Sequence, residues 1–132
     1  YDIIHPGHVR YLLEARKAGD YLIVAVNSDE SVKTLKGDKR PINCLSERMT
    51  VLAGLYFVDF VVPFKELDPY HIISILKPDI LIKGGDWPLD KIIGKDIVEA
   101  NGGKVFTIPE IKGCSTTGTI EKILEIHKEK DS

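Results

Sequence analysis

Two histidines enclose a Pro-Gly pair near the start of the chain, in the stretch HPGH. Apolar residues follow at helical spacing, and Pro6 suits the first position of a helix because its nitrogen has no hydrogen to leave unpaired. His5 and His8 then share one side of the first turn, where free backbone N–H groups and the helix dipole attract anions. Gly7 leaves the backbone open to a bulky group. The spacing predicts a phosphate site, although packing of the two rings is the commoner role when nothing else supports chemistry.

A single cluster of basic residues stands out in a chain whose formal net charge is −2. The stretch VKTLKGDKRP carries Lys33, Lys36, Lys39 and Arg40 around a glycine. Such a loop could close over phosphate groups, while exposed loop lysines are often only solvated charges, which is what we expect of Lys33 and Lys39. The small net charge predicts no general attraction to nucleic acid, so we expect no nucleic-acid partner.

Hydroxyl side chains gather before the last helix that the sequence predicts. Ser115, Thr116 and Thr117 lie just ahead of apolar residues at helical spacing. Hydroxyls and free N–H groups at a helix start form a second place where phosphate can bind, while capping of the helix alone would also explain them.

Polar residues follow two of the predicted strands. Asn27, Ser28 and Asp29 come after the apolar run YLIVAV, and Lys83 follows DILI within the sequence KGGD. The carboxyl ends of parallel strands meet at one edge of a sheet, which is where ligands bind in such folds. A helix cap and a simple turn are the alternatives for these two stretches.

The apolar pattern predicts helices and strands in alternation. Short continuous apolar runs, typical of parallel strands covered on both faces, lie at 21–26, 57–62, 79–82 and 104–108. Helical patterns begin near Pro6 and continue at 29–35, 46–55, 69–76, 91–100 and 117–128, with Ser46 and Asp68 as expected caps. This order predicts an α/β fold, a Rossmann-like doubly wound parallel sheet. Because the chain starts inside a strand-to-helix loop, we expect the first strand of that sheet to lie upstream of Tyr1.

The size and composition predict one domain over residues 1–132. Of the 132 residues, 43% are hydrophobic and 29% are charged, which suits a globular chain with a single core. Cys44 and Cys114 match no metal spacing and are expected to be ordinary small apolar residues in a reduced compartment. We read no signal peptide and no apolar run of membrane length, and therefore expect a cytoplasmic protein without a membrane partner.

Three signatures in order resemble those of one enzyme superfamily. The stretches HPGH, IKGGDW and GCSTTGTIEKI are similar to the motifs of the H-x-G-H nucleotidylyltransferases, and the resemblance spans nearly the whole chain. In detail the chain resembles the adenylyltransferase domain that makes ADP-heptose, a precursor of the lipopolysaccharide core, from heptose 1-phosphate. Glycerol-3-phosphate cytidylyltransferase is similar too.

The resemblance implies transfer of AMP from ATP to a sugar 1-phosphate, with release of pyrophosphate. A phosphate oxygen of the acceptor attacks the α-phosphate in line, so catalysis rests on alignment and on stabilising charge at phosphoryl oxygens. Three residues would be catalytic: His5 and His8 as donors to the triphosphate, and Lys36 as a mobile cation. Mg²⁺ bound through the nucleotide phosphates is the expected cofactor, and no metal site built from protein ligands is expected.

The resemblance also implies where the two substrates bind. For the nucleotide we assign Gly7 to the triphosphate, Lys83, Gly84 and Asp86 to the base and ribose, and Ser115, Thr116 and Thr117 to the phosphates. For the acceptor we assign Asn27, Asp29 and Arg48, with a surface ion pair as the alternative for Arg48. Asp2 is expected to be structural, and Trp87 either flanks the base or is only partly buried.

One difference bears on the choice of nucleotide. Cytidylyltransferase relatives carry an arginine shortly before the serine-threonine signature, where this chain has Glu110 and Lys112. The difference favours ATP over CTP. Three hypotheses stay open: AMP transfer to a sugar 1-phosphate, CTP-dependent transfer to another acceptor such as glycerol 3-phosphate, and a nucleotide-binding module without catalysis. A homodimer and a sugar-kinase domain fused upstream also stay open.

Overall fold

The computed structural model describes residues 1–85, 87–110 and 113–130, without the side chains of residues 129 and 130. The helices are α1 (Pro6–Lys17), α2 (Asp29–Lys36), α3 (Leu45–Ala53), α4 (Tyr70–Leu76), α5 (Lys95–Ala100) and α6 (Thr116–Lys130), with a turn of 3-10 helix, η1 (Leu89–Lys91). The strands are β1 (Ile23–Asn27), β2 (Phe60–Phe64), β3 (Ile80–Gly84) and β4 (Lys104–Ile108). This alternation confirms the predicted α/β fold.

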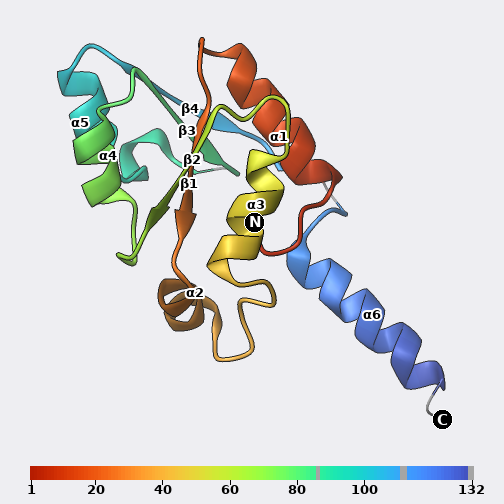
Figure 1. The fold of residues 1–132 in the computed structure, drawn as a ribbon. Helices are drawn as coiled ribbons and strands as arrows, with labels where there is room; N and C mark the ends of the chain where they lie inside the picture. The colour runs from red at the N-terminus through yellow and green to blue at the C-terminus, as the bar shows by residue number, and fades with distance from the viewer. Residues whose placement is uncertain (86, 111–112, 131–132) are drawn as a thin grey trace.

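The strands pair as two parallel sheets of two strands each, β1 with β2 and β3 with β4. Figure 1 shows the strands between α1 and α3 on one side and α4 and α5 on the other, with α6 extending away from the rest of the fold. The ladders among the described residues stop short of the one continuous sheet that we predicted, because β1 and β3 do not pair. The further strand expected upstream of Tyr1 stays a prediction.

The core holds together the elements whose ends carry the predicted site. Its buried residues are Leu12 of α1, Val24 and Val26 of β1, Leu52 of α3 and Phe57. Val24 and Val26 point to the same face because side chains alternate along a strand. Burying a side chain of this size stabilises the fold by roughly 1.5–3 kcal/mol. The start of α1 and the carboxyl end of β1 are therefore fixed relative to α3.

Two predicted elements have different bounds. The strand expected at 57–62 lies instead at Phe60–Phe64, because Phe57 is buried in the core ahead of the strand. The helix expected at 91–100 is divided into η1 and α5. Gly94 lies between them with φ 89°, in the left-handed region that favours glycine, and it ends the helical pattern.

The helix caps differ from prediction at α3 and at α4. Cys44, and not Ser46, occupies the cap position of α3. The Cys44 side chain is exposed, with Sγ 3.3 Å from the Ser46 hydroxyl, so the prediction of an ordinary apolar cysteine is wrong for Cys44. At α4 the cap position is Pro69, one residue later than expected, although the Asp68 carboxylate still accepts a hydrogen bond of 2.9 Å from the backbone N–H of Tyr70, the first helical residue.

No helix in the described part of the chain is long and apolar enough to cross a membrane.

Candidate functional site

The stretch HPGH, which we call the histidine turn (residues 5–8), forms the start of α1. His5 is the cap residue and Pro6 the first residue of the helix, as predicted. The two histidines cap each other: the His8 backbone N–H donates to His5 Nδ1 and the His5 backbone N–H donates to His8 Nδ1, both at 3.4 Å. Their rings are stacked with centroids 3.8 Å apart. The spacing that suggested chemistry therefore brings both imidazoles to one place.

Both imidazoles are held in the neutral form. Burial is the largest cause that lowers the pKa of His8 to about 3, and the positive charge of Lys36 adds to it, while a hydrogen bond with the Ile3 backbone acts to raise it. Burial also lowers the pKa of His5, while the charge of Glu110 acts against this. Because each Nδ1 accepts a backbone N–H, the proton of each neutral ring is assigned to Nε2. The turn thus offers two imidazole N–H donors beside the free N–H groups of a helix start.

Gly7 lies where the histidine turn meets the serine-threonine stretch. A Cβ at Gly7 would lie 2.9 Å from two atoms of the His5 ring and 3.2 Å from the Cβ of Cys114. Both contacts are closer than side chains tolerate without movement, so a glycine allows this close approach. The start of α1 and the segment leading into α6 are therefore in contact.

The hydroxyl residues at the start of α6 have mixed roles. Ser115 Oγ accepts a hydrogen bond of 2.8 Å from the Gly118 backbone N–H, which is the capping alternative considered for it. The Thr116 hydroxyl donates to the Ile3 carbonyl at 3.3 Å and is buried, whereas Thr117 is exposed. The bond from Thr116 to Ile3 holds the start of α6 against the segment that leads into the histidine turn.

The loop after β3 brings a cation and an aromatic ring together. Lys83 Nζ lies 5.2 Å from the centre of the Trp87 ring, and Trp87 is 52% exposed. A Cβ at Gly84 would lie 3.3 Å from the ring of Tyr11, so this glycine packs on α1. Asp86, also predicted to bind the nucleotide, lies outside the described residues.

Glu110 connects this loop to the histidine turn. A Cβ at Gly85 would lie 3.4 Å from the Trp87 indole nitrogen and 3.5 Å from Glu110 Oε1. The same carboxylate raises the pKa of His5, which places its charge within reach of the imidazole. In the sequence analysis, Glu110 was used only to weigh ATP against CTP. Its position two residues after β4 is the signal that could have placed it at this edge of the fold.

Of the three residues assigned to the acceptor, Asp29 and Arg48 form an ion pair with each other. Asn27 ends β1, and Ser28 caps α2 by accepting a hydrogen bond of 3.2 Å from the Ser31 backbone N–H. Arg48 Nη2 donates to Asp29 Oδ1 at 2.7 Å, and the Arg48 side chain is only 3% exposed. Arg48 therefore forms the ion pair that we considered as the alternative to acceptor binding. The pair is not fully on the surface, because the Arg48 side chain is buried while that of Asp29 is 40% exposed.

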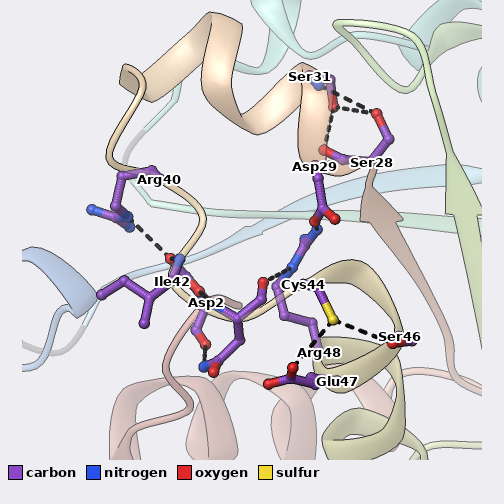
Figure 2. Close-up of polar contacts among 11 residues, drawn as sticks. Asp2, Ser28, Asp29, Ser31, Arg40, Ile42, Cys44, Ser46, Glu47 and Arg48 are labelled. Carbon is purple, nitrogen blue, oxygen red and sulfur yellow. Dashed lines mark hydrogen bonds and ion pairs between the residues drawn. The ribbon is translucent and has the colours of Figure 1, made fainter.

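Asp2 anchors the loop before α3, as the structural role expected of it requires. Its carboxylate accepts hydrogen bonds of 2.8 Å from the backbone N–H groups of Ile42 and Asn43, and one of 3.1 Å from Arg40 Nε. Burial acts to raise the pKa of Asp2, but these three donors together outweigh it and lower the pKa. Arg48 Nε donates to the Asn43 carbonyl at 3.0 Å, so the chain of contacts continues to the Asp29–Arg48 pair (Figure 2). We call these residues the Asp2–Arg48 network: Asp2, Asp29, Arg40, Ile42, Asn43 and Arg48.

A small cavity at the carboxyl end of β1 joins three of the predicted residues. Asn27, Lys36 and Arg48 line it together with Asp2 and Arg40, and its volume is about 70 Å³. The Lys36 side chain is exposed, and its charge contributes to lowering the pKa of His8. Lys36 therefore lines this cavity, and its charge also acts on His8 of the histidine turn.

Comparisons with known proteins show which family the chain belongs to. Residues 1–128 match the sequence profile of the cytidylyltransferase-like family. The chain is 58% identical over 123 residues to "Bifunctional protein HldE" of Haemophilus influenzae (strain PittGG), covering 93% of the chain and 26% of that protein. It is 55% identical over 123 residues to the protein of the same name from Nitrosococcus oceani, with the same two shares. The chain thus spans about a quarter of the length of these relatives.

One solved structure has a similar fold. The lipopolysaccharide core biosynthesis protein from Thermoplasma volcanium GSS1 superposes with a TM-score of 0.67 at 29% sequence identity. The match covers 86% of this chain and 92% of that chain.

Proposed function

The chain belongs to the cytidylyltransferase-like family of nucleotidyltransferases, and we propose that it transfers AMP from ATP to heptose 1-phosphate. The products are ADP-heptose and pyrophosphate. A new bond forms between a phosphate oxygen of the acceptor and the α-phosphorus of ATP. The bond from that phosphorus to the oxygen bridging to the β-phosphate breaks, and its electron pair leaves with pyrophosphate. No covalent enzyme intermediate and no redox step are involved.

The observation that carries this proposal is the mutual capping of His5 and His8. With both Nδ1 atoms occupied by backbone donors, each neutral ring has its N–H on Nε2, where it can donate to an oxyanion in place of a protein carbonyl such as that of Ile3 beside His8. Donors fixed before the reaction stabilise charge that develops on phosphoryl oxygens without further reorganisation. A module that only binds nucleotide would not need both of these donors.

Lys36 and the start of α6 complete the phosphate site in this proposal. Lys36 is an exposed side chain at the end of α2, so it can move toward charge that appears on the leaving pyrophosphate. The first turn of α6 contributes backbone N–H groups, with Ser115, Thr116 and Thr117 at its start. Lys83, Gly84 and Asp86 are assigned to the base and ribose.

Mg²⁺ is the proposed cofactor. The ion prefers oxygen ligands, keeps several waters and is commonly bound through substrate phosphates. The part of the chain that the structure describes has no group of three or more His, Cys, Asp or Glu side chains able to hold a metal, so the fitting ligands are the triphosphate oxygens. When bound there, Mg²⁺ neutralises phosphate charge.

The choice of a heptose acceptor rests on the relatives and on the sequence. The name of the structural neighbour assigns that protein to lipopolysaccharide core biosynthesis, and the resemblance of the motifs to an ADP-heptose-forming domain agrees with it. The curated relatives are called bifunctional, which supports our proposal that a sugar-kinase domain accompanies this one in the full-length protein. We also propose a cytoplasmic location, and a homodimer remains part of the hypothesis.

A second candidate is CTP-dependent transfer to glycerol 3-phosphate, which the description of the family favours. The acidic side chain of Glu110, close to His5 and Gly85, favours ATP instead, because cytidylyltransferase relatives carry an arginine near that place. Polar groups built for one base reject another strongly when they are left unpaired.

Pyrophosphate release by the full-length protein tests the proposal. ATP and CTP are each supplied with heptose 1-phosphate and with glycerol 3-phosphate, and rates are compared at subsaturating nucleotide. We expect ATP with heptose 1-phosphate to be preferred on the order of a hundredfold over CTP. Equal or better use of CTP with glycerol 3-phosphate would overturn this choice and support the second candidate.

A further inference from the structure

Two arginines line the cavity at the carboxyl end of β1, and they differ in what their guanidinium groups already bind. Arg48 spends Nε on the Asn43 carbonyl and Nη2 on Asp29. Arg40 is bound through Nε alone, to Asp2 at 3.1 Å. Among the described residues, Arg48, which the sequence assigned to the acceptor, therefore has two of its three guanidinium nitrogens bound, whereas Arg40 has only one bound.

The terminal nitrogens of Arg40 are available to a ligand. Among the described residues they contact no hydrogen-bond acceptor, and no buried side-chain nitrogen or oxygen in that part of the chain lacks a partner. The terminal nitrogens must therefore reach solvent, although the side chain as a whole is only 13% exposed. Figure 2 shows one edge of the guanidinium turned to Asp2 and the other end turned away from it.

The charge of the cavity suits an anion. Lys36, Arg40 and Arg48 line it with a single carboxylate, that of Asp2. The Asp2 carboxylate also accepts hydrogen bonds from the backbone N–H groups of Ile42 and Asn43. Part of its negative charge is therefore stabilised by the backbone, and Arg40 is not its only partner. A volume of about 70 Å³ is roughly that of two waters in the liquid, which suits one small polar group.

Building on the function proposed above, we propose that Arg40 binds the phosphate of the acceptor substrate, a phosphate monoester, in this cavity. A guanidinium presents paired N–H groups that match two phosphate oxygens, and the bond to Asp2 fixes its orientation. Lys36 at the same cavity has its charge within reach of His8. A phosphate held by Arg40 therefore lies beside the groups that would stabilise the transferring phosphoryl group, with its sugar outside the cavity.

The first test measures binding without turnover. Inorganic phosphate is titrated calorimetrically into the full-length protein saturated with a non-hydrolysable ATP analogue, which occupies the nucleotide phosphate site. Arg40→Gln removes the charge but keeps a donor for Asp2, and we expect it to weaken phosphate binding roughly ten- to a hundredfold. Lys39→Gln is the matched control, because it makes the same charge change at the neighbouring exposed position outside the cavity. We expect it to bind phosphate like the unmodified protein.

A second test separates binding from a structural role. We expect Arg40→Gln to raise the KM for heptose 1-phosphate by a similar factor while the KM for ATP stays unchanged, whereas a distorted loop would alter both. If Arg40→Gln does not fold, Arg40→Lys keeps a charge beside Asp2 and loses only the paired donors, with a smaller expected loss.

The outcomes distinguish this inference from the function on which it rests. The role of Arg40 would be overturned if Arg40→Gln bound phosphate as tightly as Lys39→Gln does. If Arg40→Gln does not fold, the same comparison is made between Arg40→Lys and Lys39→Gln. Loss of phosphate binding in the Arg40 variants together with an unmodified protein that releases no pyrophosphate would support the anion site and overturn only the proposed reaction.

Discussion

The histidine turn and the Asp2–Arg48 network lie next to each other and are built in opposite ways. The histidine turn is closed by two hydrogen bonds of 3.4 Å between residues that are three apart in sequence. The network is closed by bonds of 2.7–3.1 Å between segments up to 41 residues apart. Short bonds between charged groups hold firmly, and bonds near 3.4 Å hold weakly.

The difference shows where donors remain for a substrate. In the network, the Asp2 carboxylate and the Arg48 guanidinium each have several partners, so removing one of them disturbs packing. In the histidine turn, the backbone bonds occupy only the two Nδ1 atoms, and the proton of each neutral ring is on Nε2. A site for charged substrates needs its donors held in place by a well-packed support, which is the part that the network can supply.

The largest effect is expected from removing one imidazole of the histidine turn. His8→Ala should lower turnover roughly a hundredfold or more, because one donor to the transition state is lost, and should lower stability by only about 0.5 kcal/mol through loss of a weak cap bond. Pyrophosphate release and thermal unfolding measure the two quantities. His127→Ala, at an exposed histidine of α6, is the control. Full activity of His8→Ala, or its failure to fold, would show that the ring only packs.

Breaking the network should give the reverse result. Asp2→Asn removes a buried charge that three donors share, and we expect a loss of about 3 kcal/mol in the free energy of unfolding. Turnover by the protein that remains folded should fall far less than in His8→Ala. Urea unfolding followed by circular dichroism measures the loss. Asp38→Asn makes the same change at an exposed aspartate of the nearby loop and should leave stability within about 0.5 kcal/mol. Similar stabilities of the two variants would contradict the supporting role of the network.

The two regions also differ in how far sequence could predict them. The histidine turn depends on local rules, since Pro6 fixes the helix start and a spacing of three places both rings on one side. The contacts of Asp2 with Arg40 and Asn43 join residues 38 and 41 positions apart, and no local pattern specifies such partners. Arg48 shows the consequence: its sequence position suggested a substrate ligand, and only the fold places Asp29 beside it.

Local and long-range determinants also separate the predicted from the unpredicted features of the fold. The order of helices and strands follows from apolar periodicity and was predicted, whereas the strand bounds at β2 depended on Phe57 turning into the core. The pairing of strands is a long-range property and is seen as two separate ladders among the described residues. Local patterns thus suggested candidate donors, and the tertiary contacts show which of them already have partners within the protein.

The last expected effect is that of pH, and it arises mainly in the histidine turn. The pKa of His8 is about 3 in the folded protein and 6.5 ordinarily, with burial as the main cause. Between these values the unfolded chain binds a proton that the folded protein does not, so stability rises with pH and is lost as the pH falls below about 6.5. The pKa of Asp2 is also lowered, but from 3.8, so its contribution is lost only at more acidic pH. We therefore expect unfolding midpoints in urea to decline between about pH 6.5 and 4.5, with a shallower decline in His8→Ala and an unchanged one in His127→Ala. An identical slope in all three proteins would mean that His8 is charged in the folded state, and the assignment of neutral donors in the histidine turn would be wrong.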